Sequence, residues 1–502
     1  MNALLVHPEF PATFWSYQYA LPFVRKKAAL PPLGLLTVAS LLPDDWQKRL
    51  VDLNVRSLAS DDLDWADYAF VGGMAVQRAS AGDIVARCNE AGVPVVAGGP
   101  LFTAEHSDFA GVDHFALNEA EVTLPRLLSD LAEDSPRRVY RATEFADVTK
   151  SPVPLWELAD LERYQSMTVQ YSRGCPYDCE FCNVTVLFGR SPRIKTADQI
   201  IRELEALRTC GWRGQVFFAD DNLIGNRKHV KTELLPALIE WQRSRGGRRE
   251  NRRRKGEMTF YTQTSVNLAD DDELLQMMAE AGFHTVFVGI ETPDEEGLVG
   301  SNKKHNLRRD LIADVKRIQR ARLQVQAGFI VGFDSDRPSI FQRQIDFIQQ
   351  SGIVTAMVGL LQAPAGTRLF ERLKLEGRLL GKISGDNTDG TTNIIPKMDA
   401  EVLKVGYQRI LDHIYSPKHF YGRVRTFLRE YQLPKVRTPT TPEDLRAFFR
   451  SVWHLGVRGE ERRHYWSLLA WTLMRRPRLL PLAVTLAIHG HHFRKVTELQ
   501  VL

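Results

Sequence analysis

Short apolar runs alternate with helical patterns over the first 135 residues. Five runs, rich in Val, Leu, Ala and Phe and closed by Gly, Pro or Asn, lie at residues 3–8, 49–55, 68–74, 93–99 and 114–119. Such runs are typical of buried parallel strands, and the helical patterns at 31–42 and 80–92 are long enough to cross between them. We therefore predict an α/β fold over residues 1–135, a doubly wound, Rossmann-like sheet that binds ligands beyond the carboxyl ends of its strands.

A second alternation follows a charged, proline-punctuated linker at residues 136–164. Its strand-like runs lie at 167–173, 215–221, 258–265, 285–291, 325–333 and 355–363, with helical patterns between them. The helix expected at 196–211 has Thr196 or Asp198 to cap its start and Gly211 to end it. Six strand–helix units are fewer than a closed eightfold barrel requires. Residues 165–395 are therefore predicted to form a partial (β/α)6 TIM barrel, open on one side, with its chemistry at the carboxyl ends of the strands.

The pattern becomes helical and basic in residues 396–502, which we predict to be a third, helical domain facing substrate or membrane. Residues 464–496 contain two apolar helical stretches joined by Arg475, Arg476, Pro477 and Arg478. Such a segment is either an interfacial membrane anchor or a buried helical hairpin, and the clustered arginines favour the interface. Neither half is long enough to span a bilayer, so no transmembrane helix is predicted.

Charge and cysteine content narrow the classes of function. The net charge is only +5 among 66 basic and 61 acidic residues, so the sequence does not indicate a nucleic-acid partner. The basic run at 243–255 is more typical of a solvated loop than of a phosphate site. Five cysteines and the lack of a signal-peptide pattern at the start predict a cytoplasmic protein, with peripheral contact at the inner face of the membrane.

Three of the five cysteines lie within eight positions, in the sequence SRGCPYDCEFCNV: Cys175, Cys179 and Cys182. A structural zinc site would need a fourth ligand at matching spacing, and none is near. The other two, Cys88 and Cys210, fall in helical patterns and are interpreted as small core residues. A four-iron cluster held by three thiolates keeps one iron open, and an open metal position is a site for chemistry.

The CxxxCxxC spacing at the end of the first barrel strand, with Phe181 just before the last cysteine, resembles the radical S-adenosylmethionine (SAM) superfamily. The resemblance implies a [4Fe-4S] cluster on Cys175, Cys179 and Cys182. It also implies that SAM chelates the open iron and that one electron cleaves SAM to a 5′-deoxyadenosyl radical. An electron donor such as flavodoxin or ferredoxin is then an expected partner.

The same resemblance assigns SAM contacts to other strand ends. One of Asp220, Asp221 and Asn222 is expected to meet the methionine amino group, although the superfamily often has Gly-Gly-Glu there. Ser265 is placed at the methionine carboxylate and Glu291 at the ribose hydroxyls. The adenosine is expected against Phe181, residues 328–333 and residues 362–367, which begin with Gln362.

A doubly wound domain directly before such a barrel resembles the cobalamin-binding class of the superfamily, and this resemblance covers residues 1–395. It implies that cobalamin lies between the two domains, with its nucleotide tail passing the turn Gly98, Gly99 and Pro100. No DxHxxG sequence is present, and His7, His106 and His114 lack that context. The cobalt is therefore expected to have no histidine beneath it, and the candidates for its lower side are Met74, Gln77 and Arg78.

Within this class the arrangement is similar to the hopanoid C-methylases and, more distantly, to the anaerobic tetrapyrrole cyclases. It implies a methyltransferase that acts on an unactivated carbon of a hydrophobic lipid or isoprenoid substrate. A ring-forming or oxidative cyclase would use the same parts without methyl transfer. A tRNA-modifying enzyme would place residues 243–255 on phosphates but normally carries an added RNA-binding domain, and a cobalamin sensor would not need the cluster.

Overall fold

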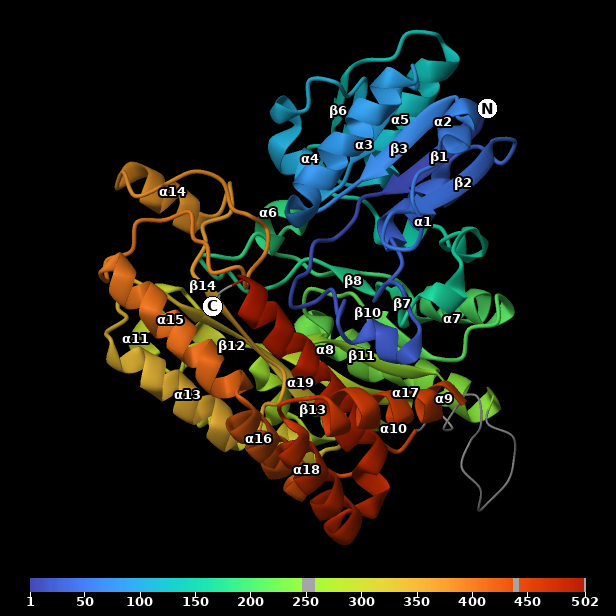
Figure 1. Ribbon diagram of the computed structural model, residues 1–502. Coiled ribbons are helices and arrows are strands. Elements are labelled where there is room, and N and C mark those ends of the chain that lie inside the picture. The colour runs from blue at the N-terminus through green and yellow to red at the C-terminus, as the bar shows by residue number, and fades with distance from the viewer. Residues whose placement is uncertain (246–257, 437–441, 501–502) are drawn as a thin grey trace.

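The computed structural model describes residues 1–245, 258–436 and 442–500. Figure 1 shows one domain above a larger one, with a group of helices in orange and red along the lower part of the molecule. Most of the basic run at 243–255 lies outside the described residues. Only Arg243, Ser244 and Arg245 are described, at the end of a helix.

The upper domain contains a six-stranded parallel sheet of order β2-β1-β3-β4-β5-β6. Its strands are β1 (Asn2–His7), β2 (Gln47–Asp52), β3 (Tyr68–Gly72), β4 (Val95–Gly98), β5 (His114–Leu117) and β6 (Val139–Arg141). The order reverses between β1 and β3, which is the switch point where doubly wound folds bind ligands. The strand β6 pairs with β5 although its residues were assigned to the linker at 136–164, so the sheet extends further than predicted.

Helices cover both faces of this sheet. Buried side chains of α1 (Leu33–Leu41) and α5 (Ala120–Ala132) pack on one face. The other face holds α2 (Ser60–Trp65), α3 (Arg78–Glu90) and α4 (Pro100–Glu105), including the buried Cys88. The near-continuous apolar strands are buried on both sides, as parallel sheets require. The predicted doubly wound fold is confirmed.

The larger domain contains a second six-stranded parallel sheet, of order β14-β13-β12-β11-β10-β7. Its strands are β7 (Ser166–Val169), β10 (Gln215–Phe218), β11 (Thr259–Thr264), β12 (Phe283–Glu291), β13 (Gln324–Val331) and β14 (Ala356–Leu360). The main helices between them are α7 (Ala197–Thr209), α9 (Leu235–Arg245), α10 (Asp272–Ala281), α12 (Leu311–Arg320), α13 (Ser339–Ser351) and α14 (Arg368–Leu375). Thr196, not Asp198, caps α7: its side chain accepts a hydrogen bond from Gln199 N. The predicted partial barrel is confirmed.

The two faces of the barrel strands differ in character. Side chains on the helix side, such as Phe218, Phe260 and Val288, are buried in one large core. Side chains on the inner side, the lumen, alternate with them and keep partial exposure: Phe217, Tyr261, Gln263, Phe287, Gln326, Ile330 and Met357. The helix side therefore supplies the packing energy, and the lumen is not filled by the strands alone.

The N-terminal segment, residues 10–29, closes the open side of the barrel. Its end runs beside the edge strand β7, where Ser166 N donates to Ala29 O. Its start enters the lumen, where the Trp15 ring lies 5.3 Å from Phe287 and its Nε1 is 3.1 Å from Met357 Sδ on the other edge strand. This segment therefore connects the two edges of the open sheet.

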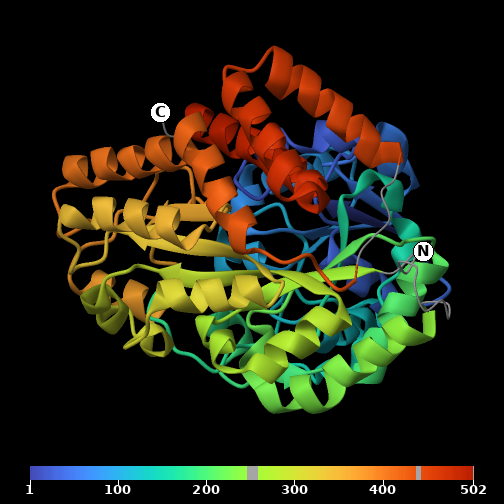
Figure 2. The ribbon, with the colours of Figure 1, turned by 90° about the horizontal axis from the view of Figure 1, so that it is seen from below.

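The last part of the chain is helical, as predicted. It contains α15 (Ala400–Tyr415), α16 (Pro417–Glu430), α17 (Pro442–Ser451), the π-helical turn η11 (Val452–Val457), α18 (Arg462–Arg475) and α19 (Leu480–Gln500). Seen from below, these orange and red helices lie on the opposite side of the strands from the green helices of the barrel (Figure 2). The helix α19 is long and buried: Phe493 stacks on Phe14 at 4.2 Å, and His492 Nε2 donates to Phe14 O at 3.0 Å. Within the described residues no helix is both long and apolar enough to cross a membrane.

Candidate active site between the two sheets

The three clustered cysteines lie in a loop at the carboxyl end of β7. The loop begins after the short strand β8 (Ser172–Arg173) and ends at α6 (Val184–Phe188). Gly174 precedes the first cysteine with φ +95°, and a Cβ there would lie 3.0 Å from the carbonyl oxygens of Phe188, Gly189 and Ser191. Only glycine combines this left-handed conformation with so close a backbone approach.

Hydrogen bonds fasten the cysteine loop to two other strand ends. Glu180 N donates to Ser301 O at 2.9 Å, and Asn302 Nδ2 donates to Asp178 O at 2.6 Å. The Glu180 carboxylate also accepts from Arg372 Nε of α14 at 2.7 Å. The loop is therefore held in place between the segment after β12 and the segment after β14.

The thiols themselves are partly buried. Burial raises the pKa of Cys175, Cys179 and Cys182, to about 12 for Cys182, while the positive charge of Lys303 acts in the opposite direction. Among the described residues no three His, Cys, Asp or Glu side chains converge on a single metal ion. Three thiolates of a four-iron cluster bind three different irons, and a bound metal deprotonates a coordinating thiol outright. The donor set fits a cluster of this kind.

Replacing Gly174 with alanine is expected to lower iron binding and stability. The new Cβ would contact three carbonyl oxygens and would also disfavour the positive φ, which alone costs about 1–2 kcal/mol. Gly211→Ala is a matched control, because Gly211 has φ +93° but open space around its Cβ position. Iron content and thermal unfolding of both variants measure the difference. Equal iron content in the two variants would show that the close approach is unimportant.

A buried ion pair lies next to the cysteines. Lys303 Nζ is 2.6 Å from Glu291 Oε1, and both side chains are about nine-tenths buried. Burial opposes the charge of Lys303, but Glu291 and the nearby thiols outweigh it and raise the pKa of Lys303. Glu291 has φ +65°, and Gly289 leaves the space that its carboxylate occupies. Lys303 was not predicted from the sequence.

The residues after β10 do not all face the open site. The Asp220 carboxylate is fully buried and accepts hydrogen bonds from Ser172 N at 2.5 Å, Ser172 Oγ at 2.6 Å and Tyr171 N at 3.2 Å. Burial raises the pKa of Asp220 to about 7. Because these bonds occupy its oxygens within the start of the cysteine loop, Asp220 is not placed to meet a methionine amino group.

The neighbours of Asp220 lie closer to the thiols. Asp221 accepts from Gly174 N at 3.0 Å. The Asn222 side chain bonds both to Ser265 N and to Ser265 Oγ at 3.2 Å. Ser265 Oγ then donates to Asn267 Oδ1, and Asn267 Nδ2 donates to Tyr177 OH at 2.8 Å. Asp221, Asn222 and Ser265 therefore stay as candidates, and each is joined to the cysteine loop, Asp221 through Gly174 N and the other two through Asn267 and Tyr177.

A cavity of about 320 Å³ lies on one flank of the cysteine loop. Phe181 and Phe333 line it with ring centroids 6.1 Å apart, together with Ser301, Leu361 and Leu369. Gln362 does not line it. Its Nε2 instead donates to Asp386 O and Thr391 O at 3.2 Å, because its side chain turns toward the loop that follows α14. The Gln362 side chain therefore points away from this cavity, whereas Phe181 lies where a flat ring can stack.

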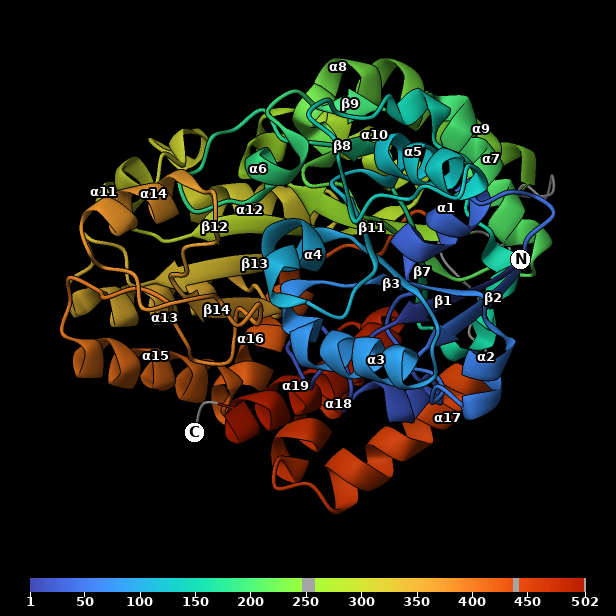
Figure 3. The same cartoon turned by 90° about the horizontal axis from the view of Figure 1, so that it is seen from above.

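The carboxyl ends of the two sheets face each other across a buried charge network. Arg173, at the start of the cysteine loop, binds Glu119 at 2.8 Å and Glu121 at 2.7 Å, and both glutamates follow β5 of the upper sheet. Arg193 binds Glu119 at 3.0 Å. Burial alone would raise the pKa of Glu121, but the Arg173 guanidinium lowers this pKa to about 2. Figure 3 shows the upper domain lying over only part of the barrel.

Met74, Gln77 and Arg78, near the switch point of the upper sheet, are the candidates for the lower side of the cobalt. Two of the three have side chains that are bound by hydrogen bonds. Gln77 is buried, accepts from Met74 N and donates to Pro8 O, so it shapes the turn. Arg78 binds Glu105 with both arms of its guanidinium at 2.7 and 2.6 Å. These bonds engage the polar ends of Gln77 and Arg78, whereas the Met74 side chain is 52% exposed.

The glycine turn after β4 is shaped for close approach. A Cβ on Gly98 would lie 2.8 Å from Ala116 O, and Gly99 has φ +88° beside Gly73 O. Pro100 then begins α4. His7 lies at the end of β1, but burial lowers its pKa and its ring is next to Gln77. His106 and His114 lie elsewhere in the domain.

Comparison with known proteins places the chain in a family. The radical SAM superfamily matches residues 169–360, and a domain of unknown function (DUF4070) matches residues 367–501. An uncharacterized methyltransferase of Synechocystis sp. is 40% identical over 99% of this chain and 92% of its own length. The hopanoid C-2 methylase of Rhodopseudomonas palustris is 35% identical over 94% of this chain and 89% of its own length.

Solved structures show the same fold. The cobalamin-dependent SAM radical enzyme OxsB, with aqua-cobalamin and SAM bound, has a TM-score of 0.62 at 13% identity and covers 99% of this chain and 80% of its own. The radical SAM methyltransferase TsrM of Kitasatospora setae has a TM-score of 0.60 at 16% identity, covering 95% and 99%. The fold, the thiol loop and these matches define a radical SAM enzyme with a doubly wound upper domain. The chain belongs to the family that includes the hopanoid C-2 methylase.

Proposed function

We propose that this protein is a cobalamin-dependent radical SAM enzyme that methylates an unactivated carbon of a hydrophobic, polycyclic isoprenoid lipid. The observation that carries the proposal is the junction of the two sheets. The thiol loop and the ligand-binding edge of the upper sheet lie against each other through Arg173, Glu119 and Glu121. A cofactor of each domain would therefore share one site.

The residues present fit three cofactors. Cys175, Cys179 and Cys182 would hold a [4Fe-4S] cluster. The methionine part of SAM would meet Asp221, Asn222 and Ser265, its ribose Glu291 and its adenine the Phe181 cavity. Cobalamin would lie at the β1/β3 switch point, with its tail along Gly98, Gly99 and Pro100 and Met74 at its lower side. Bound together, these groups would supply a carbon radical and a methyl donor. They would thus place a methyl group on a carbon that polar transfer could not methylate.

The lumen supports a hydrophobic substrate. Phe217 and Tyr261 stack at 4.9 Å, and Trp15 lies over Phe287 and Met357. These side chains keep partial exposure inside the barrel, so they offer an aromatic surface there. Aromatic rings and an adaptable thioether side chain suit a hydrocarbon ring system. The relative named hopanoid C-2 methylase supports the same substrate class.

The function is tested with SAM that carries a deuterated methyl group. Turnover of a hopanoid should place the label in the product and release S-adenosylhomocysteine and 5′-deoxyadenosine together. Release of 5′-deoxyadenosine with substrate but without label in any product would overturn the methyltransferase proposal and favour a ring-forming reaction.

Replacing Trp15 with alanine is expected to lower kcat/KM for a detergent-solubilised hopanoid about tenfold, which corresponds to about 1.4 kcal/mol. The indole covers Phe287 and Met357, so its loss removes apolar contact inside the lumen. Trp453→Ala is the control, because Trp453 is also a partly exposed tryptophan but lies on the C-terminal helices. Equal kinetics for the two variants would contradict a substrate site in the lumen.

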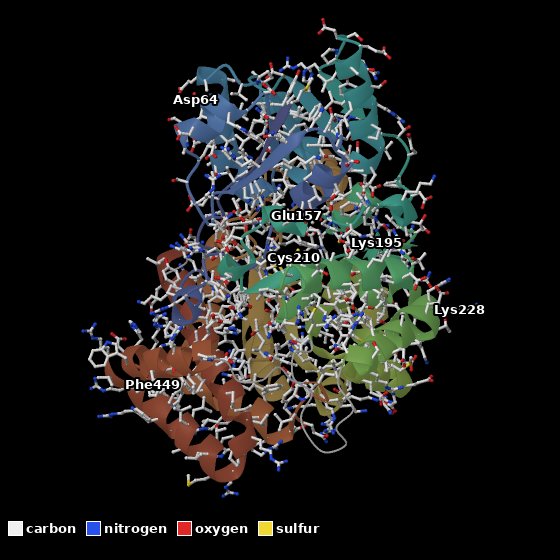
Figure 4. All side chains as sticks on the ribbon, turned by 90° about the vertical axis from the view of Figure 1, so that its right-hand side faces the viewer. Asp64, Glu157, Lys195, Cys210, Lys228 and Phe449 are labelled. Atoms are coloured by element: carbon white, nitrogen blue, oxygen red, sulfur yellow. The ribbon has the colours of Figure 1, made fainter. Side chains whose placement is uncertain are left out.

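We also propose peripheral contact with anionic membranes, through α17 and η11 rather than through α19. The helix α19 is buried, whereas α17 and η11 expose Leu445, Phe449 and Trp453 to 55%, 67% and 49%. These residues recur every four positions, and Phe449 points outward in Figure 4. Arg458 lies over the Trp453 ring at 4.9 Å, so apolar and cationic groups share the face.

The Phe449→Glu/Trp453→Glu variant is expected to lose flotation with anionic liposomes, because each carboxylate removes apolar burial and adds repulsion. A control variant, Val402→Glu/Val405→Glu, changes two exposed apolar residues of α15 in the same way and should still float. Equal recovery of both variants with the liposomes would contradict this membrane surface.

A further inference from the structure

A second cavity, of about 340 Å³, lies on the outer side of the cysteine loop. Tyr177 and Asp178 of the loop form one wall, and Lys304 and His305 form another. Arg190 and Arg368 complete the rim. The cavity shares no lining residue with the Phe181 cavity, so it is a separate feature of the same loop.

The floor of this cavity is rigid and close to the thiols. The rings of Tyr177 and His305 stack with centroids 3.7 Å apart, and Tyr177 OH accepts from Asn267 at 2.8 Å. Tyr177 and Asp178 occupy positions between Cys175 and Cys179. A molecule that seats on this floor would therefore be separated from the cluster ligands only by the loop itself.

The rim is cationic. It carries Arg190, Lys304 and Arg368, all exposed, against one carboxylate, Asp178. Asp178 already binds Arg368 at 2.6 Å and lies 3.8 Å from Arg190. Lys304 forms no ion pair within the described part of the chain. Three cations and one anion give the lining a net charge of +2, which suits an acidic partner.

The proposed chemistry requires an electron from outside the chain. The sequence has only two cysteines beyond the loop, Cys88 in the upper sheet's core and Cys210 at the end of α7, which is too few for a second cluster. We propose that the cavity and its rim, Arg190, Lys304 and Arg368, dock a small acidic electron-transfer protein of the flavodoxin or ferredoxin kind. This inference rests on the proposed radical function. One electron leaves the carrier, which is oxidised by one electron, and reduces the cluster from the 2+ to the 1+ state.

Electron-transfer encounters of this kind are small and depend on charge. They bury little surface, and complementary charges raise the association rate, which then falls as salt screens the charges. A rim of three exposed cations around a stacked aromatic floor fits such a transient contact. Neither the lumen nor the membrane surface takes part in it.

The test uses the variant Arg190→Glu/Lys304→Glu/Arg368→Glu, which reverses three charges. Its control, Arg138→Glu/Arg141→Glu/Lys150→Glu, reverses two arginines at β6 of the upper domain and one lysine of the segment that leads to the barrel, all three exposed. Calorimetry gives the Kd of each protein for oxidised flavodoxin and for oxidised ferredoxin and so shows which carrier binds. Stopped-flow absorbance gives the rate at which each reduced carrier, or dithionite, reduces the cluster.

The rim variant should bind the carrier at least tenfold more weakly and accept its electron at least tenfold more slowly, with an unchanged rate from dithionite. The control should match the wild type, whose Kd should rise with salt. Wild-type Kd and rate in the rim variant, or equal losses in the control, would overturn the proposal. If the rim variant assembled no cluster, its Kd for the oxidised carrier would still show whether the rim binds the carrier. Carrier binding without methyl transfer would support this surface while refuting the proposed function.

Discussion

Replacing Cys179 with alanine is expected to remove nearly all cluster iron and to reduce 5′-deoxyadenosine formation below detection. The loop supplies three thiolates to a four-iron cluster, and two thiolates leave a second iron without a protein ligand. The wild-type protein, reconstituted without oxygen, should bind about four irons per chain. Iron analysis and visible absorbance measure the loss, and 5′-deoxyadenosine is measured by chromatography.

Cys210→Ala is the control for this experiment. Cys210, labelled in Figure 4, is exposed directly after α7 and before the start of β10, whereas the thiol loop follows the carboxyl end of β7. Its replacement should leave iron content and turnover unchanged. If the Cys175→Ala/Cys179→Ala/Cys182→Ala variant kept wild-type iron and absorbance, the cluster assignment would be wrong.

The cluster cysteines were predictable because their spacing is local. Three thiols within eight residues must share one loop whatever the surrounding fold does. The two sheets were predictable for a similar reason, since a buried parallel strand is a short apolar run wherever it occurs. The strand β6, only Val139–Arg141, was missed because two of its three residues are exposed and carry no such pattern.

The SAM and cobalamin contacts depend on side-chain direction, which spacing does not fix. Asp220 and Asn222 both follow β10, yet one turns into the loop base and the other toward Ser265. Gln77 bonds to Pro8, 69 positions away in the sequence, and Arg78 bonds to Glu105, 27 positions away. Such long-range bonds leave no mark in a local stretch of sequence.

The sequence could not decide between the two alternatives for residues 464–496, for a physical reason. Residues 464–496 are apolar enough for either an interface or a core, and amphipathic patterns cannot say which neighbour covers them. In the structure α19 is covered by the N-terminal segment, through Phe14 and Tyr17. Exposed apolar residues lie on α17 and η11, at Leu445, Phe449 and Trp453, and also on α18, at Leu473 and Met474.

Replacing Lys303 with methionine is expected to have the largest effect of any single change in the barrel outside the thiols. The change leaves the Glu291 carboxylate buried without its partner, which costs about 3–5 kcal/mol for a pair of this kind. It also removes the positive charge that lowers the pKa of the neighbouring thiols, so iron uptake should slow. Urea unfolding and the rate of iron reconstitution measure the two effects.

Two further variants make the result specific to burial. Arg317→Met breaks the Arg317–Asp272 pair, which has the same 2.6 Å distance but exposes both side chains, and should shift the urea midpoint little. The double variant Lys303→Met/Glu291→Gln removes both charges and should recover much of the stability, because no unpaired charge remains buried, but not the rate of iron uptake. Equal midpoints for Lys303→Met and Arg317→Met would show that the buried pair contributes nothing special. Recovery of both stability and iron uptake in the double variant would assign Lys303 a structural role only, since the thiols would then not depend on its charge.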